Sequence, residues 1–185
     1  ANLEVSKSFM KEICTSANIP TAKYAKFNEL GSARKYVEEQ GAPIVIKADW
    51  LAAGKGVTVA MDLPTAYQAL EEIFKSGSQN LETKVVIEEF MEGEEASFFV
   101  LCNGQKLLPI GTAQDHKRVG DGDTGPNTGG MGAYSPAPVL TGKIEDTVIE
   151  EIIKPTLREM ERRGAPYQGV LYAGLMIKDE KARLV

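Results

Sequence analysis

Two lysines and the glycines that flank the second one are the residues best suited to bind a polyanion. Lys47 closes an apolar, β-branched run, and Lys55 follows it by eight residues, between Gly54 and Gly56. Glycines let a backbone approach phosphate closely and leave its N–H groups free to donate. If residues 44–60 form a strand, a loop and a second strand, both ammonium groups can face one phosphate chain. The alternative is a glycine-rich turn that carries a solvated lysine.

Acidic side chains gather further along the chain, in a pattern that suits a nucleotide. Five glutamates lie within residues 88–95, around Phe90 and Met91. Backbone groups at these two apolar residues can read an adenine edge, while a carboxylate accepts hydrogen bonds from ribose hydroxyls. Strand alternation places Glu95 and Ser97 on one face. The alternative is a solvated acidic turn.

A glycine-rich stretch with three consecutive cationic residues is the third candidate. Residues 111–132 hold seven glycines, together with His116, Lys117 and Arg118. Such a stretch cannot bury a core and is too long for a plain connector, so we expect a functional loop. The cationic triplet can clamp an anionic substrate or a transferring phosphoryl group. A charged surface loop is the alternative, and a single histidine is weak evidence for acid–base chemistry.

The elements that position these residues follow from the apolar pattern. Helical spacing predicts helices over residues 5–17, 32–40, from Pro64 onward and over 143–163, where Pro155 should kink the helix or end a segment. Strands are predicted over residues 21–27, 44–47, 57–60, 85–90, 96–102, 105–110 and 169–178. Helices and strands mix without a regular βαβ repeat. We therefore predict an α+β fold with two lobes, residues 1–90 and 91–185, and a hinge near residues 88–93.

Composition restricts the classes of protein. The 185 residues are 43% apolar and 25% charged, which is ordinary for a globular chain, and the net charge of −5 lacks the basic excess of a nucleic-acid binder. No apolar run reaches the ~18 residues of a membrane span, and no signal peptide is recognisable. Cys14 and Cys102 are the only cysteines, so a disulfide framework and a thiolate zinc site are excluded and a reducing cytoplasm is expected. Because the chain starts at Ala1 and ends in an incipient strand, we expect a fragment.

Several segments together resemble one family of ligases. They are IVIKAD (44–49), LAAGKGV (51–57), VVIEEF (85–90), GEEAS (93–97), QDHKR (114–118), GPNTGGMGAY (125–134) and GVLYAGLM (169–176). From residue 6 to residue 185 the chain resembles the phosphoribosylamine–glycine ligases (glycinamide ribonucleotide synthetases). Many ATP-grasp ligases share the lysine strand and the acidic hinge, whereas QDHKR followed by GPNTGGMGAY is specific to this family.

The resemblance implies an ATP-grasp fold, with a nucleotide held between two α+β lobes. It implies that ATP, glycine and phosphoribosylamine give ADP, phosphate and glycinamide ribonucleotide through a glycyl phosphate, in purine biosynthesis. The implied cofactors are ATP and Mg²⁺ or Mn²⁺, with the metal ligands beyond Val185. The implied partners are small molecules only, with neither nucleic acid nor membrane, for a cytoplasmic protein that we expect to be a monomer.

By position, the resemblance also implies roles for individual residues. Those expected to contact ATP are Lys47, Gly54, Lys55, Gly56, Glu88, Glu89, Phe90, Met91 and Glu95. Those expected to approach the phosphoryl group or the acyl intermediate are Lys117 and Arg118. Those expected to shape the pocket for glycine and phosphoribosylamine are Asn127, Thr128, Gly129, Gly130, Met131 and Gly132.

The sequence departs from the family pattern at three places. Trp50 stands where the family has glycine, and we expect it either to change loop mobility or to pack as a lid. Residues 78–82 replace a Phe-Gly-x-Ala-Gly stretch that closes over phosphate, and the family's metal motif would follow directly after Val185. Two alternatives therefore stay open, a nucleotide-binding module without turnover and a ligase for another amine.

Overall fold

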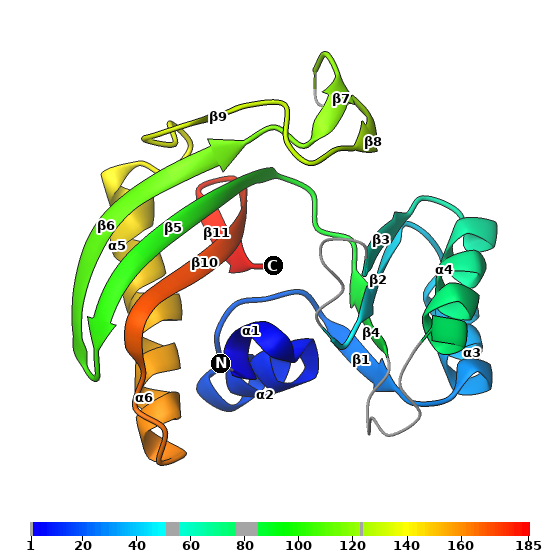
Figure 1. Ribbon diagram of the computed structural model, residues 1–185, viewed down its shortest axis with the longest axis horizontal. Coiled ribbons are helices and arrows are strands. Elements are labelled where there is room, and N and C mark those ends of the chain that lie inside the picture. The colour runs from blue at the N-terminus through cyan, green and yellow to red at the C-terminus, as the bar shows by residue number, and fades with distance from the viewer. Residues whose placement is uncertain (1, 51–55, 77–84, 123) are drawn as a thin grey trace. The chain divides into compact units, whose positions relative to one another are not determined.

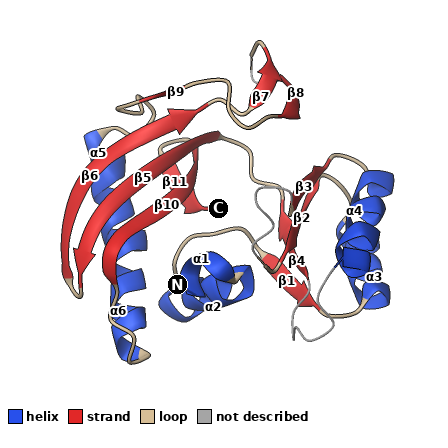
Figure 2. Cartoon of the chain, viewed as in Figure 1, coloured by secondary structure: helices blue, strands red, loops and turns tan. Residues whose placement is uncertain are grey.

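The computed structural model describes residues 2–50, 56–76, 85–122 and 124–185. The chain divides into two compact units, of which the first comprises Ala1–Thr15 with Ala22–Met91 and the second Ser16–Thr21 with Glu92–Val185. Each unit combines one main sheet with helices (Figures 1 and 2). Among the helices that the structure describes, none is both long enough and apolar enough to cross a membrane.

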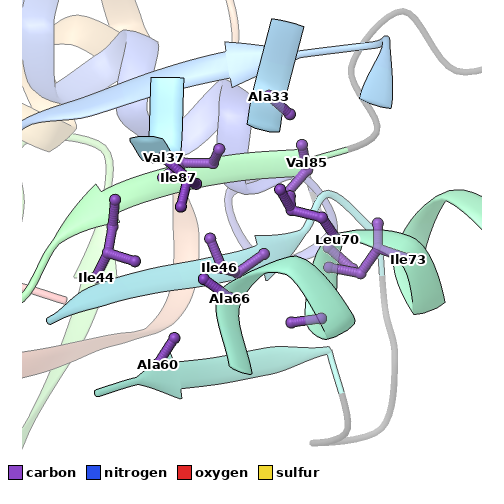
Figure 3. Close-up of a cluster of buried hydrophobic side chains, with 12 residues drawn as sticks. Ala33, Val37, Ile44, Ile46, Ala60, Ala66, Leu70, Ile73, Val85 and Ile87 are labelled. Atoms are coloured by element: carbon purple, nitrogen blue, oxygen red, sulfur yellow. The ribbon is translucent and has the colours of Figure 1, made fainter. Parts of the chain in front are cut away.

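The first unit is built on an antiparallel sheet of four strands. Their order is β1 (Tyr24–Phe27), β4 (Val85–Glu89), β2 (Ile44–Ala48) and β3 (Val57–Ala60). Helices α3 (Leu30–Gln40) and α4 (Leu63–Ser76) cover one face, where Val37 and Leu70 pack against Ile46 and Ile87 (Figure 3). These β-branched and aliphatic side chains are removed from water, which drives the unit together.

Helix α2 (Lys7–Ala17) lies on the opposite face of this sheet, after the short helix α1 (Asn2–Val5) (Figure 1). Successive strand residues point to opposite faces. Ile87 therefore joins the core beneath α3 and α4, while Glu88 points toward α2. The register places Glu88 opposite Tyr24 on β1 and opposite Val45 on β2.

The second unit is built on an antiparallel sheet of five strands. Their order is β11 (Lys181–Leu184), β10 (Gln168–Lys178), β5 (Glu94–Asn103), β6 (Lys106–Asp115) and β9 (Ala133–Tyr134). Helices α5 (Gly142–Val148) and α6 (Lys154–Arg162), joined by the π-helical segment η1 (Ile149–Ile153), cover one face (Figure 2). A separate hairpin pairs β7 (Arg118–Gly120) with β8 (Thr124–Asn127).

Most predicted elements are present, and three differ from the prediction. The helix expected over residues 5–17 is divided at Ser6, whose hydroxyl accepts a hydrogen bond from the Phe9 N–H and so starts α2 afresh. The single loop expected over residues 111–132 is wrong, because β6 continues to Asp115 with Thr112 and Gln114 buried, and the β7–β8 hairpin follows. The strand expected from residue 21 begins at Tyr24.

The helix expected over residues 143–163 forms one helical path. Its wide π-helical turn, η1, ends immediately before α6, in which Pro155 lies in the first turn. Proline has no N–H and so removes one hydrogen bond of the α-helical pattern, and the irregular turn η1 ends two residues before it.

Candidate functional site

A buried cluster of one carboxylate and two ammonium groups lies between α2 and the sheet of the first unit. Glu88 Oε2 lies 2.9 Å from Lys11 Nζ, and Glu88 Oε1 lies 3.0 Å from Lys47 Nζ. The side chains of all three are at most 8% exposed. Val45 pairs with Glu88, and Lys47 follows Val45 by two residues, so strand alternation puts both charges on the face that α2 covers.

Burial and the neighbouring charges act against each other in this cluster. Burial lowers the pKa of Lys11, and the carboxylate of Glu88 opposes that effect. Two buried cations therefore share one anion. A face with this surplus of positive charge is suited to bind an anionic ligand, for which charge-assisted hydrogen bonds are the strong ones.

A third lysine belongs to the same region. Lys7, at the start of α2, donates from Nζ to the Trp50 carbonyl oxygen at 3.1 Å. Its pKa is lowered, chiefly by burial and also by the positive charge of Lys47, while the charges of Asp49 and Glu88 act in the opposite direction. Lys7 and Lys47 thus contribute positive charge to one place, although they lie 40 residues apart in the sequence.

Sequence reasoning missed both Lys7 and Lys11. A signal was present, because Lys7, Lys11 and Cys14 recur at helical spacing on one stripe of α2, and the last two are fully buried. A lysine on the buried stripe of a helix needs a partner of opposite charge. The sequence does not say that this partner is Glu88, 77 residues away from Lys11.

An apolar surface adjoins the cluster on β3. Val57 pairs with Lys47 and Val59 pairs with Val45, so both valines lie on the face of the lysines. They are 46% and 37% exposed. Exposed valines beside buried cations can receive a ligand that has a flat apolar part and an anionic part.

The predicted phosphate loop is described in part. Lys47 lies at the end of β2 in the cluster, while Lys55 and Gly54 lie outside the described residues. Gly56 is buried and its carbonyl oxygen accepts a hydrogen bond from the Ala48 N–H at 2.7 Å. This hydrogen bond joins Gly56, the residue directly before β3, to the end of β2 next to Lys47.

The end of β4 holds the remaining residues expected to contact a base. Glu89 accepts from the Lys23 N–H at 3.0 Å through its carboxylate, and its own N–H donates to the Lys23 carbonyl oxygen at 2.9 Å. Met91 is buried and Phe90 is half-buried. The double contact anchors the end of β4 to Lys23, the residue directly before β1, so the backbone at Phe90 and Met91 starts from a fixed point.

Trp50 is not a lid. Its side chain packs, partly buried, against the apolar core formed by α3, α4 and the sheet. Its carbonyl oxygen serves as the acceptor for Lys7. The other departure from the family pattern, residues 78–82, lies outside the described residues.

In the second unit the structure brings together Glu95 on β5 and Lys117. The Lys117 ammonium donates to Glu95 Oε1 at 2.9 Å and lies 3.8 Å from Asp115 Oδ1. Burial acts to lower the pKa of Lys117, but the hydrogen bond and charge of Glu95 and the charge of Asp115 outweigh it, so the pKa is raised. Lys117 therefore places a positive charge beside the carboxylate expected to hold a ribose.

The segment expected to shape the substrate pocket is tied to the chain around Lys117. The Thr128 N–H and hydroxyl both donate to the Lys117 carbonyl oxygen, at 2.6 and 2.9 Å, and the Gly130 N–H donates to the Thr128 hydroxyl at 3.0 Å. Arg118 and Asn127 are opposite residues of the β7–β8 hairpin. These contacts place the predicted substrate residues next to the predicted catalytic pair.

Backbone bonds continue this arrangement around His116. The Met131 N–H donates to the His116 carbonyl oxygen at 2.7 Å, and the His116 N–H donates to the Gly132 carbonyl oxygen at 2.9 Å. Gly130 and Gly132 have φ angles of +130° and +138°, which only glycine adopts readily. Gly129 and Met131 are exposed, so this part of the segment presents its surface to solvent.

Comparison with known proteins shows which family the chain is similar to. Residues 5–185 match the family model described as "Phosphoribosylglycinamide synthetase, ATP-grasp (A) domain". The chain is 60% identical over 185 residues to a phosphoribosylamine–glycine ligase of Mesorhizobium japonicum, of which it covers 44%. It is also 60% identical over 179 residues to the chloroplastic phosphoribosylamine–glycine ligase of Arabidopsis thaliana, of which it covers 34%, with 96% of this chain aligned.

Solved structures agree on the fold. The phosphoribosylamine–glycine ligase of Thermotoga maritima matches all of this chain and 47% of its own, with a TM-score of 0.88 and 34% identity. A D-alanine–D-alanine ligase of Bacillus anthracis complexed with ATP matches 98% of this chain and 54% of its own, with a TM-score of 0.65 and 18% identity. The fold is the ATP-grasp fold, and the chain spans less than half the length of the curated relatives reported above.

Proposed function

The chain belongs to the phosphoribosylglycinamide synthetase family, as its ATP-grasp domain, and on this premise we propose that it is the ATP-binding part of a ligase that joins glycine to 5-phosphoribosylamine. The products are glycinamide ribonucleotide, ADP and phosphate, in purine biosynthesis. A carboxylate is a poor electrophile, so the glycine carboxylate is first phosphorylated by ATP. The amine of phosphoribosylamine then displaces phosphate from the glycyl phosphate.

The observation that carries the proposal is the lysine cluster of the first unit. Phosphoryl transfer needs positive charge that is already in position, because charge on the phosphoryl oxygens must be stabilised without reorganisation. Glu88 holds Lys47 at 3.0 Å, and Lys7 adds a second positive charge nearby. In our proposal these two lysines contact the phosphates of ATP, and the exposed Val57 and Val59 receive the base.

In this proposal the second unit supplies the residues that bind the ribose, the transferred phosphoryl group and the two other substrates. Glu95 accepts from the ribose hydroxyls, and Lys117, paired with Glu95 at 2.9 Å, orients the transferred phosphoryl group together with Arg118. The segment from Thr128 to Gly132 shapes the pocket for glycine and phosphoribosylamine. Its hydrogen bonds to the backbone of residues 116 and 117 support this assignment, because they join substrate-binding and phosphoryl-orienting residues in one structure.

Magnesium or manganese is the expected cofactor of the whole enzyme. In the described parts of the chain, no three His, Cys, Asp or Glu side chains come close enough to hold a metal ion.

The setting we propose is a reducing compartment in which the partners are small molecules. Cys14 and Cys102 are both free and buried, which is the normal state of thiols in a cytoplasm. We propose a cytoplasmic monomer. The Arabidopsis relative, by its name, is chloroplastic.

Binding and turnover assays on the full-length protein test this function. Calorimetric titration with ATP and magnesium should show binding, and phosphate release should require both glycine and phosphoribosylamine. Binding without glycine-dependent phosphate release would instead indicate a nucleotide-binding module without turnover. Release with a different amine would indicate another carboxylate–amine ligase.

A further inference from the structure

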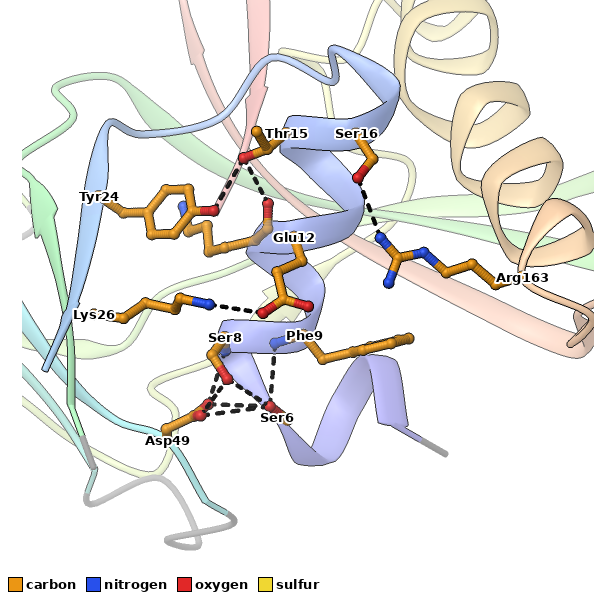
Figure 4. Close-up of polar contacts among 11 residues, drawn as sticks. Ser6, Ser8, Phe9, Glu12, Thr15, Ser16, Tyr24, Lys26, Asp49 and Arg163 are labelled. Atoms are coloured by element: carbon orange, nitrogen blue, oxygen red, sulfur yellow. Dashed lines mark hydrogen bonds and ion pairs between the residues drawn. The ribbon is translucent and has the colours of Figure 1, made fainter. Parts of the chain in front are cut away.

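Asp49 connects the two chain segments that carry Lys7 and Lys47. It follows β2 directly, two residues after Lys47, and is only 8% exposed. Its carboxylate accepts from the Ser8 N–H at 2.8 Å and from the Ser8 hydroxyl, and Ser6 Oγ lies 3.3 Å from Oδ1 (Figure 4). One buried carboxylate thus takes three donors from a segment 41 to 43 residues away.

These donors form the first turn of α2, in which Lys7 is the first helical residue. Ser6 caps the helix, since its hydroxyl oxygen accepts from the Phe9 N–H at 3.1 Å. The first N–H groups of a helix have no acceptor within it. Asp49 supplies an acceptor to the N–H of Ser8, so the helix start is held against the end of β2.

Lys7 itself has one hydrogen bond to this segment and is influenced by the charge of Asp49. Its ammonium group donates to the carbonyl oxygen of Trp50, the residue after Asp49, at 3.1 Å. The charge of Asp49 raises the pKa of Lys7, against burial and against the positive charge of Lys47. Without this carboxylate, Lys7 would lose its anchored position and the larger of the two negative charges, Asp49 and Glu88, that oppose its repulsion by Lys47.

We propose that Asp49 is a positioning residue, which contacts no nucleotide itself but fixes Lys7 beside Lys47 so that both ammonium groups meet one phosphate chain. The inference rests on the proposed function, because it gives the lysines a phosphate ligand. It also makes a prediction that does not follow from the lysine cluster alone: any effect of Asp49 on ATP binding must depend on Lys7.

A double-mutant cycle in the full-length enzyme tests this requirement. The four proteins are wild type, Asp49→Asn, Lys7→Ala and the double variant, each titrated with ATP in the presence of magnesium. Asparagine keeps the size of aspartate, but it has no charge and its NH₂ group cannot accept from the serine hydroxyls. We expect Asp49→Asn to weaken ATP binding roughly tenfold in the wild type and less than about twofold in the Lys7→Ala background.

Asp62→Asn is the matched control. Asp62 also accepts from an N–H at a helix start, that of Thr65 at 2.8 Å in the first turn of α4, but it is exposed and no cluster lysine lies on that turn. We expect this variant to lower the thermal midpoint slightly and to leave the Kd for ATP within about twofold of wild type. Ser8→Ala, which keeps the carboxylate and removes one donor, provides a milder second cycle with Lys7→Ala if Asp49→Asn does not fold.

The outcomes separate the inference from the function on which it rests. The positioning role is overturned if Asp49→Asn, or Ser8→Ala in its place, weakens ATP binding equally with and without Lys7. It is also overturned if the variant lowers the thermal midpoint but leaves ATP affinity unchanged. Unchanged ATP affinity in both Lys7→Ala and Lys47→Ala would instead overturn the phosphate site of the proposed function. If Lys47→Ala weakens ATP binding, and the effect of Asp49→Asn on ATP binding depends on Lys7, both the proposed function and the positioning role of Asp49 are supported.

Discussion

Lys47 and Glu88 face each other at 3.0 Å from neighbouring strands, and both are almost wholly buried. The pairing is diagonal, since the residue directly opposite Glu88 is Val45. Removing two charges from water costs several kcal/mol per ion, and the attraction within the pair offsets that cost. Glu88 also pairs with Lys11, so one carboxylate serves two lysines and the site keeps a surplus of positive charge. In our proposal this surplus of positive charge receives the phosphates of ATP.

Replacing Lys47 by alanine should weaken ATP binding in the full-length enzyme. The phosphate would lose a charge-assisted partner worth roughly 1.5–3 kcal/mol, which corresponds to roughly 10- to 150-fold in Kd. Isothermal titration measures the change. Lys35→Ala is the control, because that side chain is 78% exposed and pairs with Glu39 on its own helix. Equal affinity in wild type and Lys47→Ala would contradict the role of Lys47.

Replacing Glu88 by glutamine should destabilise the first unit. Lys11 and Lys47 would remain buried without a compensating charge, and breaking a buried pair costs about 3–5 kcal/mol. Urea unfolding followed by tryptophan fluorescence measures the loss, because Trp50 packs against the core of this unit. The same change at Glu39, whose pair with Lys35 is exposed, should cost less than about 1 kcal/mol. Similar unfolding midpoints for the two variants would show that Glu88 does not compensate the lysines.

Glu159 makes the second unit sensitive to acid. Hydrogen bonds from Arg162 and Arg163 lower the pKa of this carboxyl from 4.5 to about 2. Because the pKa of Glu159 is lower in the folded than in the unfolded chain, its ionised form stabilises the fold. This stabilisation is fully present above pH 4.5 and is lost as the pH falls toward 2. Glu159→Gln should therefore be less stable than wild type at pH 7, and the difference should shrink over that interval.

Denaturant unfolding between pH 2 and pH 7 measures this difference. Glu151→Gln, an exposed position of η1 in the same helical path, is the control and should show no such trend. A difference between Glu159→Gln and wild type that stays constant with pH would refute the linkage.

Gly93→Ala should destabilise the second unit. Gly93 has a φ angle of +147°, and an added Cβ would lie 2.4 Å from the Ile177 carbonyl oxygen, a backbone atom that cannot move aside cheaply. We expect a loss of at least about 2 kcal/mol, measured as a lower thermal midpoint. Gly142→Ala is the control, because a Cβ there meets no atom within 4 Å and the position lies in a helix. Equal midpoints for the two variants would mean that the backbone near Gly93 relaxes.

Local pattern was enough to predict much of the fold. The β-branched run that ends at Lys47 is a fully buried strand, and the apolar spacing around Leu70 marks a helix that packs on it. Hydrophobic periodicity reports which face of an element is buried, and that information is contained in neighbouring residues. The predicted lengths were less accurate where polar residues continue an element. Thr112 and Gln114 are buried in β6, for example, although the glycines around them suggested a loop.

The candidate site was predicted in part for the same reason. Lys47, Glu88, Glu95 and Lys117 all stand in recognisable segments, and the structure pairs the first two in one unit and the last two in the other. The roles assigned to them stay predictions. Lys55 and Gly54 lie outside the described residues. The roles of Lys7, Lys11 and Asp49 were missed because each depends on a partner more than 40 residues away in the sequence.

The sequence by itself determined the kinds of element, their buried faces and the family to which the chain is similar. Only the tertiary structure decided which charges meet. Lys11 and Glu88 are 77 residues apart, and Ser8 and Asp49 are 41 residues apart. Contacts of this kind depend on strand register and on how α2 lies across the sheet. Both are set by the packing of the whole unit, because the free energy of pairing two buried charges is realised only after the elements that carry them have come together.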